Sequence, residues 1–167
     1  MRLIDLFEQQ PAYRPNWVRY TPQSLQQDYE EYLLKQNSKW RGRAQIIGAR
    51  WPLFSSLLQF SQALDQAPIV SIDDLPQGVN NLTYNDSISD IKRMVSGYNM
   101  PRDVNRIVDG IKSGAMMPLP IILRGQKSMW IMAGNTRQAV SRVMGVEPQA
   151  LLVDVSQTDG AETTNPG

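Results

Sequence analysis

The residues best suited to bind an anion form a glycine bend, Gly134 to Arg137, between an apolar run and a helical pattern. The first amides of a helix have no partner within the helix, and the helix dipole puts partial positive charge there, so a phosphate fits this position. Gly134 permits a sharp turn and the close approach of a ligand. Asn135 and Thr136 add short polar side chains, and Arg137 adds a planar set of donors that suits phosphate. The bend therefore predicts a phosphate-binding site.

A purely structural interpretation of the same bend stays open. Asn135 could cap the helix, with Gln138 reaching back as in a capping box. Arg137 would then be an ordinary solvated arginine. A single glycine carries less information than a full phosphate-binding loop, so spacing does not choose between the two interpretations.

A second set of candidate binding residues forms a basic stretch without any acidic residue. Its members are Lys35, Lys39, Trp40, Arg41, Arg43 and Arg50. Lysine and arginine neutralise phosphates and tryptophan can stack on bases, so the stretch predicts nucleic-acid binding. The alternative is a solvated helix face whose tryptophans fill the core.

Two adjacent aspartates, Asp73 and Asp74, are the candidate catalytic residues. They follow the apolar run Ile69 to Ile72 and begin a polar loop that continues to Asp86. Their carboxylates are suited to hold a magnesium ion or to act as a general base near a nucleotide. Adjacent side chains at a strand end point in opposite directions, however, and solvated loop residues are the alternative interpretation.

Hydrophobic periodicity predicts the elements around these residues. An α+β core is expected over residues 67–155, after a helical N-terminal extension over residues 1–66 and before a disordered polar tail over residues 156–167. The strands are expected at Ile69 to Ile72, Pro120 to Leu123, Met129 to Met132 and Leu151 to Val155. The helices are expected from Pro22 to about Gln36, from Pro52 to about Asp65, from Ser87 to Gly97, from Pro101 to Gly114, and from the glycine bend to Gly145. Gln9 to Tyr20 is expected to be an extended linker.

Composition excludes several classes of site. The 167 residues include no histidine and no cysteine, which rules out Ser-His-Asp triads, disulfides and Cys/His zinc sites. Seventeen basic and 16 acidic side chains leave a net charge of +1, which argues neither for nor against nucleic acid. No run approaches the roughly 20 apolar residues of a membrane span. Met1 to Phe7 is too short and too charged for a signal peptide, so we expect a cytoplasmic protein that does not enter a membrane.

Part of the chain resembles the ParB/sulfiredoxin superfamily. Pro118 to Leu123 (PLPIIL), followed by Trp130 to Ala139 (WIMAGNTRQA), is similar to its strand, second strand and helix start. Ile69 to Leu75 resembles its first strand, and Ile107 to Gly114 resembles a helix end of the family. The resemblance covers residues 68–155 and implies a ParB/sulfiredoxin-like core.

The resemblance also implies a function. Members of this family bind nucleotide phosphates at the bend, and residues of an upstream helix also reach the nucleotide. On this analogy Arg102 and Arg106 are candidates here, and salt bridges with Asp103 are the alternative interpretation. A nucleoside triphosphate with Mg²⁺ is the implied ligand, and phosphotransfer or nuclease activity is known among relatives. ParB has Glu and Arg where Asn135 and Thr136 stand here, and sulfiredoxin chemistry is excluded because it needs a cysteine thiolate. The competing hypothesis is a non-catalytic DNA-binding or accessory interaction protein that uses the stretch Lys35 to Arg50.

Overall fold

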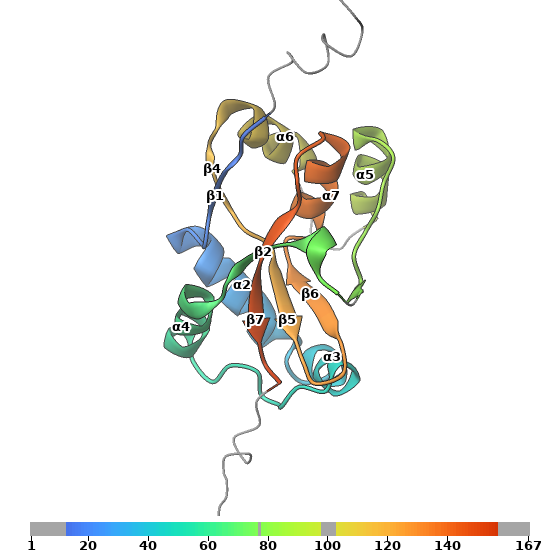
Figure 1. The fold of residues 1–167 in the computed structure, drawn as a ribbon. Helices are drawn as coiled ribbons and strands as arrows, with labels where there is room; N and C mark the ends of the chain where they lie inside the picture. Colours follow the sequence, from blue (N-terminus) through green and yellow to red (C-terminus); the bar gives the residue numbers. More distant parts are fainter. Residues whose placement is uncertain (1–12, 77, 98–102, 157–167) are drawn as a thin grey trace, which may run out of the picture.

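The computed structural model describes residues 13–76, 78–97 and 103–156 (Figure 1). The helices are α2 (Pro22–Lys35), α3 (Lys39–Ile47), α4 (Leu57–Gln66), α5 (Ile88–Val95), α6 (Val104–Ser113) and α7 (Asn135–Val143). The strands are β1 (Asn16–Val18), β2 (Ile69–Ser71), β3 (Val79–Asn80), β4 (Met116–Pro118), β5 (Ile121–Arg124), β6 (Met129–Ala133) and β7 (Gln149–Asp154), with a 3-10 turn, η1, over Ile72–Asp74. This mixture confirms the predicted α+β class.

A five-stranded mixed sheet has the order β2-β7-β5-β6-β3. Its centre is the predicted hairpin of β5 and β6, which pair antiparallel, and β7 joins β5 in parallel. Successive side chains of a strand point to opposite faces. Ile121 and Leu123 accordingly belong to one buried cluster, and Ile122 between them belongs to another.

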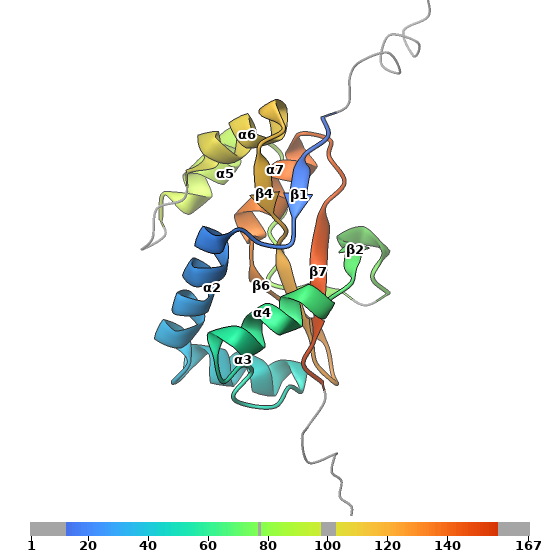
Figure 2. The ribbon, with the colours of Figure 1, turned by 90° about the vertical axis from the view of Figure 1, so that its left-hand side faces the viewer.

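The first face of the sheet is covered by α2, α3 and α4 (Figure 2). Their large apolar side chains, among them Tyr32, Trp40 and Phe60, share one buried cluster with Leu123 and Trp130 of the central strands. The helices predicted as an N-terminal extension thus pack directly on the sheet. This packing brings the basic stretch close to β6, the strand that leads into the glycine bend.

A separate buried cluster joins α5, α6 and α7 at one end of the sheet (Figures 1 and 2). Ile91, Ile111 and Val140 lie in it and are at most 1 % exposed. Because α7 packs between its neighbours here, its first turn is held rigidly where β6 ends.

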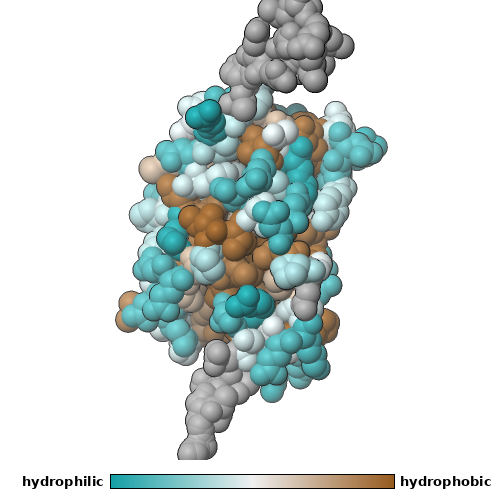
Figure 3. Space-filling view, in the orientation of Figure 1, coloured by the Kyte–Doolittle hydropathy of each residue, from teal (hydrophilic) through white to brown (hydrophobic). Residues whose placement is uncertain are grey.

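The surface is mixed in character. Figure 3 shows an apolar area near the centre of one face, about where β2 crosses β7 in Figure 1. Ile69 of β2 is 48 % exposed. None of the helices in the described ranges is long and apolar enough to cross a membrane.

One prediction about the N-terminal half is wrong. Pro52 does not open a helix: its peptide bond to Trp51 is cis, and α4 begins only after Ser56, whose hydroxyl accepts a hydrogen bond from the Gln59 amide at 3.0 Å. The intervening Phe54 turns into the core, where its amide lies 3.2 Å from the Tyr32 hydroxyl. The predicted linker contains β1, which pairs in parallel with β4.

Candidate functional site

A cavity of about 580 Å³ lies between α2, α3, β6 and the glycine bend. Helix α2 contributes Asp28, Glu30, Glu31 and Lys35, α3 contributes Lys39, Trp40 and Arg43, and the bend contributes Gly134, Asn135, Thr136 and Arg137. Side chains of β6, from Trp130 to Ala133, form its floor. The cavity therefore joins two motifs that lie about 100 residues apart in the sequence, a separation that can be counted from Lys35 to Asn135.

Glycine is required at the bend for two reasons. Gly134 has φ 85°, a left-handed conformation that other residues rarely adopt. A Cβ at this position would lie 2.6 Å from the Cα of Pro120 and 2.8 Å from Nη2 of Arg137. The close approach shows that the Arg137 guanidinium folds back over the bend, at the edge of the cavity.

The first turn of α7 is not closed by a capping side chain in the described part of the chain. Gly134 occupies the N-cap position and has no side chain to offer, so the amides of Asn135, Thr136 and Arg137 depend on other partners. All three residues line the cavity. The arrangement is the one that favours an anion at a helix start.

Asn135 does not cap the helix, and the capping-box interpretation is wrong. Its Oδ1 accepts from the Thr83 amide at 3.0 Å, and its Nδ2 donates to the Thr83 hydroxyl at 2.8 Å. Gln138, which is fully buried, donates to the Thr83 carbonyl at 2.7 Å and to Asn135 Oδ1 at 3.0 Å. The Asn135 side chain therefore ties α7 to the loop before α5.

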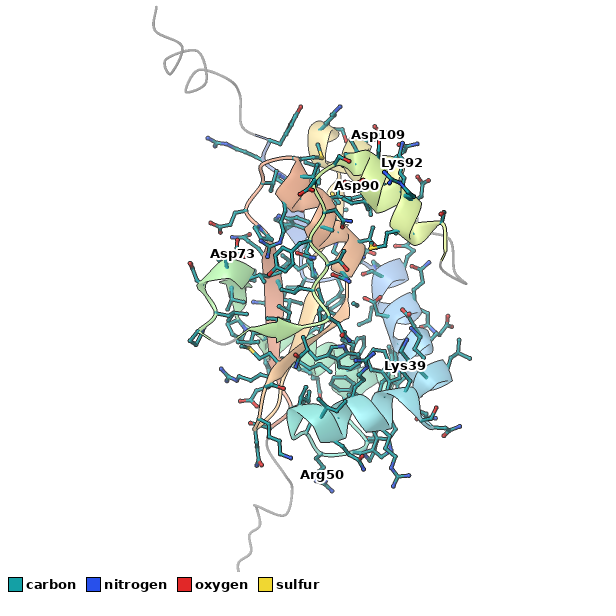
Figure 4. All side chains as sticks on the ribbon, turned by 90° about the vertical axis from the view of Figure 1, so that its right-hand side faces the viewer. Lys39, Arg50, Asp73, Asp90, Lys92 and Asp109 are labelled. Atoms are coloured by element: carbon teal, nitrogen blue, oxygen red, sulfur yellow. The ribbon has the colours of Figure 1, made fainter. Side chains whose placement is uncertain are left out.

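The basic stretch divides into residues that line the cavity and residues that do not. Lys35, Lys39 and Arg43 line it. Arg41 is exposed on α3 outside the cavity, and Arg50 lines a separate hollow of about 320 Å³ near the end of β7. Figure 4 shows Lys39 and Arg50 pointing in different directions. The basic stretch therefore does not form one binding surface. Arg41 lies outside the cavity on α3, and Arg50 lies beyond the end of that helix.

Trp40 is not available for base stacking, contrary to the prediction. It is 3 % exposed, and its ring lies 4.4 Å from that of Trp130, centroid to centroid. The Lys35 ammonium lies 5.7 Å from the centre of the Trp40 ring. Trp40 therefore builds the wall of the cavity and supports a cation there, which is the core role of the alternative interpretation.

Sequence reasoning missed Asn81, which positions Arg43. With its amide oxygen facing both donors, Asn81 accepts from Arg43 Nη1 and from Trp130 Nε1, each at 2.7 Å. The Arg43 guanidinium also lies 5.5 Å from the centre of the Trp130 ring. Asn81 has φ 68°, a conformation that asparagine tolerates better than most residues, so the asparagine pair in this loop was the available signal.

The acidic wall of the cavity was also missed. Asp28, Glu31 and Lys35 recur at helical spacing on α2, and Lys35 pairs with Glu31. This spacing places all three on one face of a helix, which was a usable signal.

Asp73 and Asp74 lie elsewhere, and the prediction that they act beside the phosphate site is wrong. Of the residues that the structure describes, the cavity lining includes neither of them. Asp73 pairs with Arg142 of α7: Nη1 donates to Oδ2 at 3.1 Å, and Nη2 lies 2.8 Å from Oδ1. Figure 4 shows Asp73 on the opposite side of the molecule from Lys39.

Of the two arginines expected on the upstream helix, only Arg106 lies within the described residues, and it does not line the cavity at the bend. Arg106 is exposed on α6, and its backbone amide donates to the Asp103 carboxylate, which caps that helix at 3.0 Å. Arg102 lies outside the described residues, as does the predicted helix start at Pro101. Within the described ranges, no group of three or more acidic, histidine or cysteine side chains is arranged to hold a metal ion.

Comparisons of the chain with protein-family models, with curated proteins and with solved structures find no match. The resemblance to the ParB/sulfiredoxin superfamily therefore stays a prediction from short motifs. The functional conclusion rests on the geometry of the cavity.

Proposed function

We propose that this protein binds a nucleotide or nucleic-acid phosphate in the cavity at the start of α7. The observation that carries the proposal is the cavity that joins the uncapped first turn of α7 to cations from two other helices, Lys35 of α2 and Lys39 and Arg43 of α3. Backbone amides and the helix dipole bind the phosphate at one side, and the ammonium and guanidinium groups add charge-assisted hydrogen bonds.

The resemblance supports the same assignment from another direction. A ParB/sulfiredoxin-like core binds nucleotide phosphates at the bend that corresponds to Gly134 to Arg137. We propose that core for this chain, with a nucleoside triphosphate and Mg²⁺ among the ligands to be tested. The proposal concerns binding and assigns no reaction, because Asp73 and Asp74 do not line the cavity.

Reversal of one cavity charge tests the proposal. Lys39 and Arg41 are both exposed on α3 and lie two residues apart, but only Lys39 lines the cavity. We expect Lys39→Glu to weaken nucleotide binding about tenfold, which corresponds to about 1.4 kcal/mol, and Arg41→Glu to leave it unchanged. Isothermal titration calorimetry with a panel of nucleotides, with and without Mg²⁺, measures both affinities.

The same pair of variants separates a small ligand from a nucleic-acid strand. A strand that follows the basic stretch would cover Arg41 and Arg50 as well, and its affinity would fall steeply as salt rises. Equal losses of single-stranded DNA binding in Lys39→Glu and Arg41→Glu would favour the DNA-binding alternative. Absence of any nucleotide or DNA binding would refute both.

A further inference from the structure

We infer that the cavity binds a phosphate monoester with a large uncharged part, such as a nucleoside monophosphate. It binds this ligand in preference to the corresponding triphosphate and to inorganic phosphate. The inference rests on the proposed function and narrows its ligand class. It depends on two properties of the cavity, its charge and its size.

The charge of the lining matches one phosphate group. Four cationic side chains, Lys35, Lys39, Arg43 and Arg137, face three carboxylates, Asp28, Glu30 and Glu31, which leaves a formal charge of +1 among the described residues. The start of α7 adds roughly +0.5 from the helix dipole. A phosphate monoester carries about −1.5 to −2 at pH 7, so the two nearly cancel.

A polyphosphate is poorly matched to the same lining. Each further phosphate adds about one negative charge or more, and these charges would meet the carboxylates of α2. Like charges brought together out of bulk water repel each other strongly. The acidic wall therefore selects against ligands that a purely cationic cavity would bind best.

The size of the cavity argues against a bare phosphate ion as the ligand. Its volume of about 580 Å³ lies within the range of roughly 300–1,000 Å³ that holds drug-sized ligands, far more than a phosphate ion fills. The floor contains the buried side chains of Trp130 and Met132, and Glu30 is exposed at the opposite wall. Carboxylate acceptors beside this additional space suit a ligand with hydroxyl groups, such as the sugar of a nucleoside, since hydroxyls donate to carboxylates.

The test compares three ligands that differ in one property at a time. Inorganic phosphate, a nucleoside monophosphate and the corresponding triphosphate, each without Mg²⁺, are titrated into the full chain in the calorimeter. We expect the monophosphate to bind at least tenfold tighter than either of the others. Triphosphate binding as tight as the monophosphate overturns the charge inference, and phosphate binding as tight overturns the size inference, while the proposed function stands in both cases.

A second test changes the charge of the cavity lining and compares the ligand preference of the variant with that of the natural chain. Glu30 makes only a hydrogen bond with Gln26 in the described structure, at 2.9 Å, so Glu30→Lys changes the lining to +3 with little structural cost. We expect it to move the preference at least tenfold toward the triphosphate. Asp109→Lys, on the exposed side of α6 and outside the cavity, adds the same charge to the protein and is expected to leave the preference unchanged (Figure 4).

The outcomes separate the two proposals. A preference that does not move in Glu30→Lys, or that moves equally in Asp109→Lys, overturns the inference alone. If none of the three ligands binds the natural chain, the proposed function falls and the inference falls with it. Circular dichroism and thermal unfolding of both variants show whether each retains the fold.

Discussion

The two ends of α7 satisfy their polar groups in different ways. At the first turn, the amides after Gly134 have no capping side chain in the described part of the chain and face a cavity. At the last turn, Arg142 pairs with Asp73, donates to Gln138 at 2.7 Å, and lies 4.7 Å from the centre of the Tyr84 ring. The residues of the first turn line an open cavity, whereas Arg142 at the last turn is paired with other parts of the protein.

The comparison indicates how this fold separates stability from binding. The network around Arg142 and Gln138 joins η1, the loop at Thr83 and α7. The rigid tie at one end holds the first turn in place at the other. Changes at the cavity end should therefore affect ligands, and changes at the network end should affect folding.

Substitution of the bend glycine should have the greatest consequence. We expect Gly134→Ala to destabilise the protein by about 2 kcal/mol or more, because a Cβ meets the Pro120 backbone at 2.6 Å in addition to the left-handed strain. Gly145→Ala, at the other end of α7, is the matched control: its φ is 74°, but a Cβ there meets nothing within 4 Å. It should cost about 1 kcal/mol. Urea unfolding measures both values, and equal losses would contradict the steric explanation.

Removal of the buried side-chain amide of Gln138 should have the next largest effect on stability. Gln138→Leu leaves the Thr83 carbonyl without this donor and Arg142 Nε without its acceptor, and it removes one of the two hydrogen bonds to Asn135 Oδ1. We therefore expect a loss of about 1–3 kcal/mol in unfolding free energy. Gln45 is exposed on α3, and Gln45→Leu should change stability by less than about 0.5 kcal/mol. A Gln138→Leu protein as stable as the natural one would show that the network does not hold α7.

The ion pair between Asp73 and Arg142, at the last turn of α7, should contribute less to the free energy of unfolding. The Asp73 side chain is 55 % exposed and that of Arg142 is 17 % exposed, so solvent screens their interaction. A double-mutant cycle with Asp73→Asn and Arg142→Met should give a coupling of about 0.5–1 kcal/mol. Nucleotide affinity should be unchanged in Asp73→Asn, and a large loss of binding would mean that the two ends of α7 are not independent.

A second ion pair, at the end of β7, should show the weakest effect and a dependence on pH. Burial raises the pKa of Asp154, but hydrogen bonds from the Ser156 hydroxyl and amide, together with Arg124, outweigh it and leave the pKa below its ordinary value of 3.8. Because the folded-state pKa is the lower one, Asp154 stabilises the fold above pH 3.8 and loses this contribution as the pH falls below that value. Stability measured from pH 6 to pH 2 should fall less steeply in Asp154→Asn. An identical slope would contradict the assignment.

Much of the backbone was predictable from local patterns. The hairpin of β5 and β6, the helix after Gly134 and the last strand all lie close to their predicted bounds. Alternation and helical spacing report which face of an element is buried, and these patterns involve only near neighbours in the chain. The start of α4 was mispredicted because Ser56 caps the helix, whereas Pro52 is a common helix-start residue used here in a turn.

The candidate site was only partly predictable for the same reason. The residue types around the bend were sufficient to select it, since Gly134 is required by local backbone geometry. The partners of Asp73, the burial of Trp40 and the contact of Arg43 with Asn81 depend on residues far away in the chain. No local pattern encodes them.

Residue order and type alone determine which chemical groups this chain can use. Without histidine or cysteine these are carboxylates, amines, guanidinium groups, hydroxyls, side-chain amides and the backbone. Residue order and type also set the bend, because a left-handed residue beside Pro120 has to be glycine. Packing of α2 and α3 against the sheet then selected which cations meet that bend and turned Arg41 and Arg50 away from it. The physical reason is range: backbone preferences act over a few residues, whereas a cavity exists only where distant surfaces fail to close against each other.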